Sequence, residues 1–311
     1  LFALRDTTGA LLYDAIIIAK PDSLFSNKDK FIIDQFIMHG GKVIWLIDPV
    51  YVNMDSLANS TATMALINTT NLEDMLFKYG VRLNPNLIQD MQCAVIPVNM
   101  ALAGQAPDFK PAPWVYFPLL VPPPNHSITR NGDLIKSEFI SSLDTVGQDP
   151  SVRKTILLYS SEYSKIVKAP VRVSLDLVSR QPDPVQFKQS QVPVAVLLEG
   201  RFESIFKNRL TPGFTNNKVV GYKEQGDSTA MIVVADGDII RNQVSYSRGK
   251  PYPLPLGFDR YTKQTFGNKE FLTNCLDYLL DNSKLMTVRS REIKLRLLNK
   301  VSISKDRLFW Q

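Results

Sequence analysis

The pattern of hydrophobic and polar positions near the N-terminus predicts a strand, a helix and a second strand. Residues 14–19 are a short apolar run rich in β-branched side chains, typical of a strand buried on both faces of a parallel sheet. Residues 28–39 carry apolar side chains at three- and four-residue spacing, which predicts a helix capped at Ser26 and ended by the glycine pair 40–41. Residues 42–47 are the next apolar run. Because parallel strands need a crossover connection, this region predicts a doubly wound, mostly parallel α/β sheet.

Further elements of the same sheet are predicted downstream. Apolar runs at 155–159, 192–198 and 231–235 predict strands. Residues 268–280 predict a helix whose apolar face covers the sheet. Residues 211–228 are rich in glycine, asparagine and lysine, so we expect a flexible loop there.

Prolines crowd around the aromatic residues Trp114 and Tyr116 between residues 97 and 124. Such a segment is confined to edge strands or extended loops. A proline-aromatic stretch can be a partner-binding surface, which makes Trp114 and Tyr116 candidate contact residues. We favour the alternative, in which an extended connection packs these aromatic side chains onto the core.

Charge is distributed unevenly, and its distribution suggests the domain organisation. Residues 284–311 carry eight basic and two acidic side chains, whereas residues 1–283 carry 28 of each. The net positive charge is therefore confined to one terminal segment and does not indicate a broad basic surface for nucleic acid, so we expect no nucleic-acid partner. We expect residues 1–283 to form one α/β domain, with its sheet core from about 13–98 and 190–283 and a strand- and proline-rich middle at about 99–190. The basic segment is predicted to lie next to a membrane.

Three aspartates directly follow predicted strands. Asp48 follows the second apolar run, and Asp236 and Asp238 follow the run at 231–235. Ligands of doubly wound sheets bind beyond the carboxyl ends of the strands, where these carboxylates could converge on a hard cation. We favour a structural role, in which Asp48 accepts backbone amides and Asp238 caps the following turn, because no other type of ligand accompanies them.

Other catalytic signals are weak. Neither a glycine-rich phosphate loop nor a nucleophile elbow follows these strands. His126, in a Pro-Asn-His-Ser loop, is a candidate for ligand or partner binding, but it has no neighbouring nucleophile. Cys93 and Cys275 lie too far apart for a zinc motif or a redox pair. We therefore expect no enzyme activity, no cofactor and no bound metal; the alternative is a metal-dependent hydrolase that uses the three strand-end aspartates.

Several distinctive stretches are spread across the sequence: Ile-Ala-Lys-Pro at 18–21, the segment from Asp34 through Gly-Gly to Asp48-Pro49, and residues 76–90, 124–126, 141–144, 197–200 and 289–300. Together these stretches resemble the GldG family, the gliding-associated ABC transporter auxiliary proteins of Bacteroidetes. The unit of two glycines, a strand and Asp-Pro is also found in the wider family of ABC transporter auxiliary proteins.

The resemblance implies an extracytoplasmic domain whose fold is similar to flavodoxin-like and glutamine-amidotransferase-like sheets. It also implies an ABC permease and an ATPase as partners, and a non-catalytic role in binding or assembly. The domain would lie on the periplasmic side of the inner membrane, anchored by flanking helices outside this sequence, since no apolar run here approaches the roughly 20 residues of a membrane-spanning helix. No catalytic residue is carried over from the family.

Overall fold

The computed structural model describes most of the chain up to residue 281. The described residues are 4–6, 9–52, 54–101, 105–130, 132–147, 149–179, 182–217, 220–247 and 249–281. The basic segment 284–311, predicted to lie next to a membrane, falls outside the described residues. Among the helices that are described, none has the length and apolarity to cross a bilayer.

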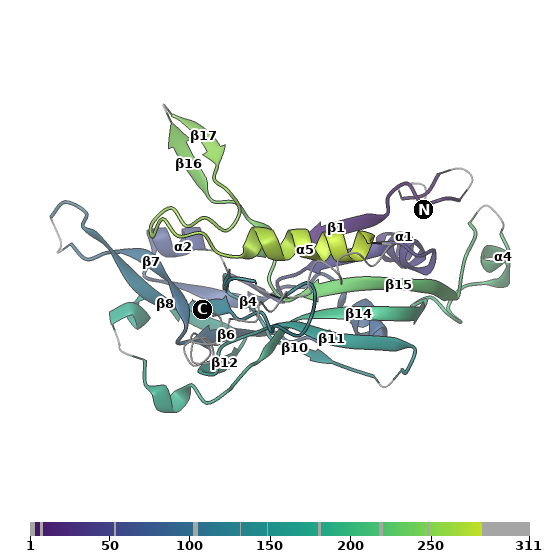
Figure 1. Ribbon diagram of the computed structural model, residues 1–311, viewed down its shortest axis with the longest axis horizontal. Coiled ribbons are helices and arrows are strands. Elements are labelled where there is room, and N and C mark those ends of the chain that lie inside the picture. Colours follow the sequence, from purple (N-terminus) through teal and green to yellow (C-terminus); the bar gives the residue numbers. More distant parts are fainter. Residues whose placement is uncertain are drawn as a thin grey trace, which may run out of the picture.

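A five-stranded sheet forms the centre of the molecule (Figure 1). Its strands, in spatial order, are β1 (Ala15–Ala19), β2 (Lys42–Leu46), β15 (Gln225–Val234), β14 (Pro193–Glu203) and β11 (Val152–Tyr159). The first three strands run parallel to one another, and the last two pairings are antiparallel. The sheet is therefore mixed, with two parallel and two antiparallel pairings, and not mostly parallel as predicted.

The connection between β14 and β15 explains the mixed pairing. Its described part holds only the four-residue helix α4 (Pro212–Thr215). A parallel pairing would need a crossover that carries the chain back to the end of the sheet at which β14 begins. Without such a crossover, the two consecutive strands pair antiparallel. Residues 225–228, predicted to be part of a flexible loop, belong instead to β15.

The predicted strand–helix–strand unit at the N-terminus is confirmed. Helix α1 (Asn27–Met38) joins β1 to β2, and Ser26 and Asp29 form a reciprocal capping box at its start. Gly40 adopts φ +89° and ends the helix. The prediction that the first strand is buried on both faces is wrong, because β1 lies at the sheet edge and Ile17 is 39% exposed.

Helices cover both faces of the sheet. On one face, α1 and α3 (Glu73–Tyr79) pack against a cluster that includes Val43 and Trp45 of β2. On the other face, α5 (Asn268–Leu280) packs against Ile44 and Leu46, the alternate residues of the same strand. The bounds of α5 agree with the predicted helix. Strand β2 is thus buried on both sides, as its continuous apolar run predicts.

The middle of the chain folds into small antiparallel sheets, most of which contribute to a third hydrophobic core, while Val81 of β5 and Leu143 of β10 belong to the first core. Their strands are β3 (Val50–Tyr51), β4 (Ala62–Ile67), β5 (Val81–Leu83), β6 (Asn86–Asp90), β7 (Cys93–Asn99), β8 (Phe109–Leu120), β9 (Ile135–Lys136), β10 (Leu143–Thr145), β12 (Ser164–Lys168) and β13 (Val171–Ser174). The remaining elements are the helix α2 (Met54–Asn59), the 3-10 helices at Leu175–Ser179, Pro184–Gln186 and Asp238–Ile240, and the hairpin strands β16 (Val244–Ser247) and β17 (Lys250–Pro253). The proline-rich region forms the β7–β8 hairpin, as expected for an extended segment.

Replacing Trp45 tests the assignment of β2 as an inner strand that is buried on both faces of the sheet. The side chain is fully buried, so Trp45→Ala leaves a cavity and is expected to lower the free energy of unfolding by about 3–5 kcal/mol. Trp45→Phe is the matched control, because it keeps most of the ring and removes an indole N–H that has no hydrogen-bond partner among the described residues. We expect it to cost about 1–2 kcal/mol. Denaturant unfolding checks both values, and an unchanged stability of Trp45→Ala would contradict the assignment.

Candidate functional site

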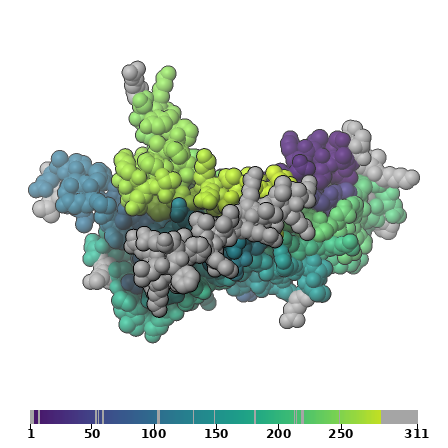
Figure 2. Space-filling view, in the orientation of Figure 1, coloured from purple at the N-terminus to yellow at the C-terminus, as the bar shows by residue number. Residues whose placement is uncertain are grey.

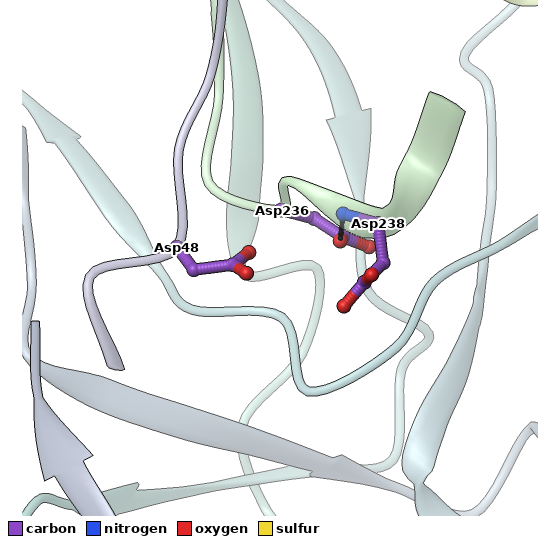
Figure 3. Close-up of side chains that lie close together, drawn as sticks. All are labelled: Asp48, Asp236 and Asp238. Atoms are coloured by element: carbon purple, nitrogen blue, oxygen red, sulfur yellow. Dashed lines mark hydrogen bonds between the residues drawn. The ribbon is translucent and has the colours of Figure 1, made fainter. Parts of the chain in front are cut away.

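The three strand-end aspartates converge at the carboxyl edge of the parallel strands (Figure 3). Strand β15 lies beside β2 with Val234 opposite Leu46, and the Ile47 amide donates to the Val234 carbonyl oxygen at 3.0 Å. This register places the residue that follows β2 next to those that follow β15. One carboxylate oxygen from each of Asp48, Asp236 and Asp238 lies within 4.8 Å of the other two.

The ammonium group of Lys20 lies against two of these carboxylates. Its Nζ atom is 2.5 Å from Oδ2 of Asp238 and 3.3 Å from Oδ2 of Asp48. Lys20 follows β1, so its side chain reaches past β2 to the end of β15. Burial acts to lower the pKa of Lys20, but the two carboxylates outweigh it and the pKa is raised. The ammonium therefore stays charged and supplies the positive charge that the carboxylates need.

Gly237 makes this approach possible. A Cβ atom at position 237 would lie 2.7 Å from Cβ and 2.9 Å from Cα of Lys20, closer than packed atoms can lie. The missing side chain lets the end of β1 pass directly over the loop after β15. The Gly237 amide also donates a hydrogen bond to Oδ1 of Asp48. Asp48 thus accepts a backbone amide, as expected, but from the opposing loop.

Asp236 is the most buried member of the cluster. Its Oδ1 accepts the Asp238 amide at 2.7 Å, and its Oδ2 accepts the Glu138 amide at 3.1 Å. We predicted that Asp238 caps this turn. Instead, the carboxylate of Asp236 accepts the first amide of the turn, that of Asp238. Burial, together with the charges of Asp48 and Asp238, raises the pKa of Asp236 well above its ordinary value. Burial also raises the pKa of Asp48, against the opposing effect of Lys20.

A second layer of charges extends the cluster toward the surface. Arg241 contacts Oδ1 of Asp238 at 3.1 Å and forms an ion pair with Glu138. Lys136 lies 3.7 Å from Glu138 and 2.7 Å from Oδ2 of Asp259. Acidic and basic groups thus alternate across the site. Burial raises the pKa of Glu138, while Arg241 and Lys136 oppose that shift.

The site opens into a small cavity of about 180 Å³. One side of this cavity is charged and the other is apolar. Its lining residues are Lys20, Glu138, Asp238 and Arg241 on the charged side, and Tyr51, Val52, Met54 and Phe139 on the apolar side. None of the described residues that line it is a serine, cysteine or histidine. The cavity offers charge and shape for binding, with carboxylate, ammonium and guanidinium groups on its charged side.

The other candidate residues lie outside this cluster. Trp114 and Tyr116 are buried in the third core, where the Tyr116 ring packs against Phe139 with centroids 5.9 Å apart. His126 lies against α5, with its ring centroid 5.0 Å from that of Tyr278. Burial lowers the pKa of His126. The structure therefore gives Trp114 and Tyr116 packing contacts and separates all three from the lining of the cavity.

Four charged residues of the site were not predicted from the sequence: Lys20, Lys136, Glu138 and Arg241. Lys20 had a usable signal, because it directly follows an apolar strand at the same sheet edge as the aspartates. Lys136 and Glu138 lie in a region whose hydrophobic pattern indicates neither helix nor strand, and the structure gives it only the two-residue strand β9. Arg241 follows a 3-10 turn and has no pattern of its own.

The position that a cation would occupy between Asp48 and Asp238 is filled by the Lys20 ammonium. A divalent ion bound there would have to displace a side chain that makes two ion pairs. The hydrogen bonds from the amides of Gly237, Asp238 and Glu138 further engage the carboxylate oxygens. This geometry fits a charge-balanced structural cluster beside a binding cavity better than an open metal centre.

Comparison with known families adds an independent finding. Residues 7–275 match the family described as "ABC-type uncharacterized transport system". The chain belongs to this family. It is an auxiliary component of an ABC-type transport system, and its partners are transporter components.

Comparison with solved structures finds a distant likeness to the "mmIFT52 N-terminal domain". The two share 11% sequence identity and a TM-score of 0.42, over 87% of this chain and 78% of that chain. A likeness at this level carries no argument about function. None of the curated proteins compared matches this auxiliary protein.

Removing the Lys20 charge tests its role in the auxiliary protein. Lys20→Met removes the cation shared by two largely buried carboxylates, of which Asp238 keeps its contact with Arg241. We expect a loss of about 2 kcal/mol in unfolding free energy, less than for a fully buried pair because the lysine side chain is 37% exposed. Lys110→Met is the matched control, since its ion pair with Asp108 is exposed on both sides. Denaturant unfolding should show equal m-values, and equal losses in both variants would contradict the role of Lys20.

The raised pKa of Asp236 predicts a specific pH dependence. The folded protein holds this proton more tightly than the unfolded chain, so the contribution of Asp236 to stability falls as pH rises through its folded-state pKa. Asp236→Asn removes the titrating group. The stability of the wild type relative to this variant should therefore decrease as pH rises from about 4, the ordinary aspartate value, to about 8. Chemical unfolding across this range checks it, and a constant difference would show that the pKa is not raised.

Proposed function

We propose that this chain is a non-catalytic binding and assembly module of an ABC transport system associated with gliding motility. The observation that carries the proposal is the strand-end cluster, in which Lys20 pairs with Asp48 and Asp238, and in which Asp238 borders a cavity lined by no serine, cysteine or histidine among the described residues. Family membership supports a role beside a permease and an ATPase. The domain would lie on the periplasmic side of the inner membrane.

The proposed GldG type rests on where the family-like stretches lie. The stretch 18–21 contains Lys20, and the segment 34–49 contains Asp48, two members of the same cluster. The residues that carry the resemblance are thus also residues that hold the strand ends together. We also infer a flavodoxin-like or amidotransferase-like core, which is supported by the parallel β1–α1–β2 unit and by helices on both faces of the sheet.

The alternative function, a metal-dependent hydrolase, is favoured by one observation, the convergence of three carboxylates within 4.8 Å. The ammonium of Lys20 argues against it because it occupies the space between two of them. A hydrolase would also need a metal-bound water with room beside the ion.

Co-purification tests the assembly role directly. Full-length protein with an affinity tag, extracted in mild detergent, should retain its permease and ATPase through gel filtration. An unrelated membrane protein with the same tag controls for carry-over. Recovery of the tagged protein without either subunit, in the presence of both in the extract, would overturn the proposal.

Thermal unfolding with divalent cations separates the two functions. Specific binding of an ion to the folded state raises the melting temperature with ion concentration. We expect Mg²⁺ and Mn²⁺ to leave the wild type unchanged, because Lys20 already fills the site. Lys20→Met is the informative comparison, since it frees the three carboxylates for an ion. A cation-dependent rise in the wild type that disappears in Asp48→Asn would favour the hydrolase.

A further inference from the structure

The β16–β17 hairpin stands clear of the body of the molecule (Figures 1 and 2). Within the described part of the chain, its two strands pair only with each other. Large side chains on it face solvent: Tyr246 is 69% exposed, and Val244 and Tyr252 are more than 40% exposed. A two-stranded hairpin with no packed face is marginally stable in water, so this geometry indicates that another surface covers it in its working state.

The base of the hairpin is firmly attached. The Leu254 amide donates to the Gln243 carbonyl oxygen at 2.8 Å, and the guanidinium of Arg260 donates to the Val244 carbonyl oxygen at 3.0 Å. The Arg260 amide also donates to the Gln243 side chain at 3.0 Å. These bonds fix the direction of the hairpin while leaving its outer half free. It is therefore an arm held in place at its root.

The charge of this arm is one-sided. The hairpin residues 244–253 contain Arg248 and Lys250 and no acidic residue, whereas residues 1–283 as a whole carry equal numbers of each sign. Lys250 is exposed on β17, directly opposite Ser247. Tyrosine and lysine together suit the border between water and hydrocarbon in an anionic bilayer, where the ring enters the headgroup layer and the ammonium meets phosphate.

The backbone of the arm argues against strand addition by a protein partner. Pro251 and Pro253 make up half of β17, and neither carries an N–H donor. A partner strand would need such donors along the exposed edge. On the side of β16, the Val244 carbonyl oxygen already accepts a bond from Arg260. Contact through side chains is thus favoured over extension of the sheet.

We propose that the β16–β17 hairpin is a membrane-contacting arm that places Tyr246 and Tyr252 among the headgroups of an anionic lipid surface. The attraction of Lys250 for lipid phosphate adds to this contact. The inference goes beyond the assembly role, because it requires neither the permease nor the ATPase. It also differs from the predicted membrane contact of residues 284–311, since it assigns the contact to a different part of the chain.

A fluorescent label on the arm gives a site-specific readout. Ser247→Cys in a Cys93→Ser background of residues 1–311 can carry an environment-sensitive dye, because Ser247 is exposed and Cys275 is buried. Emission should rise and shift to the blue with vesicles of phosphatidylcholine and phosphatidylglycerol, and much less with pure phosphatidylcholine. The same dye at Lys168→Cys, on β12 at the opposite edge of the molecule in Figure 1, should not respond.

Variants of the arm should weaken vesicle binding without unfolding the protein. Lys250→Gln should lower the apparent affinity for the anionic vesicles about fivefold, the loss expected for one juxtamembrane cation. Tyr246→Ser combined with Tyr252→Ser should abolish the blue shift. Tyr163→Ser is the matched control, because Tyr163 is 57% exposed but lies beside β12. Circular dichroism confirms that each variant is folded.

Three results would overturn the proposal. The first is the absence of vesicle binding by the labelled protein. The second is vesicle binding with no response of the dye at position 247, which would place the lipid contact elsewhere, for example in residues 284–311. The third is unchanged vesicle binding by the tyrosine variant together with loss of its co-purification with the permease, which would assign the arm to a protein partner. None of these results bears on whether the wild type assembles with its transporter.

Discussion

The parallel pairing of β2 with β15 is the contact on which the rest of the structure depends. It joins residues 43–46 to residues 231–234, which lie 188 positions apart in the sequence. Both strands are buried on both faces, so α1 and α3 on one side and α5 on the other pack against the same pair. The chain between the two strands supplies β11 and β14 of the same sheet, and it also builds the third core and the small antiparallel sheets. The sheet is mixed because β15 pairs parallel with β2 on one side and antiparallel with β14 on the other.

The same pairing creates the candidate site. It sets the end of β2 beside the end of β15 and so collects three carboxylates at one sheet edge. Burial removes water from the Asp236 carboxylate, and the nearby charges of Asp48 and Asp238 repel its ionised form, so the pKa of Asp236 is raised. Lys20 from the edge strand offsets part of that repulsion, and Gly237 leaves the room for it to do so. The contacts within the cluster thus hold the ends of β1, β2 and β15 together, and the cavity beside it supplies a surface for binding.

Elements with long, regular patterns could be predicted from the sequence. The β1–α1–β2 unit, β15 and α5 each have a continuous apolar run or a helical stripe, and the three aspartates were found because each follows such a run. The edge position of β1 and the antiparallel placement of β14 could not be predicted, since they depend on which distant strands pair. Glu138 and Arg241 were missed for a related reason, since each is a single charged residue whose partners are set by tertiary contacts rather than by spacing along the chain. Lys20 differs from them, because its place directly after β1 was a usable signal.

The central claim is that Lys20 acts as the internal cation of the strand-end cluster. A double-mutant cycle with Lys20→Met and Asp238→Asn tests it most directly, because the cycle isolates the energy that couples the two side chains. We expect the Lys20 substitution to cost much less once Asp238 is neutral, with a coupling energy of about 1–3 kcal/mol at neutral pH. A coupling energy indistinguishable from zero would show that the two charges act independently and would contradict the account.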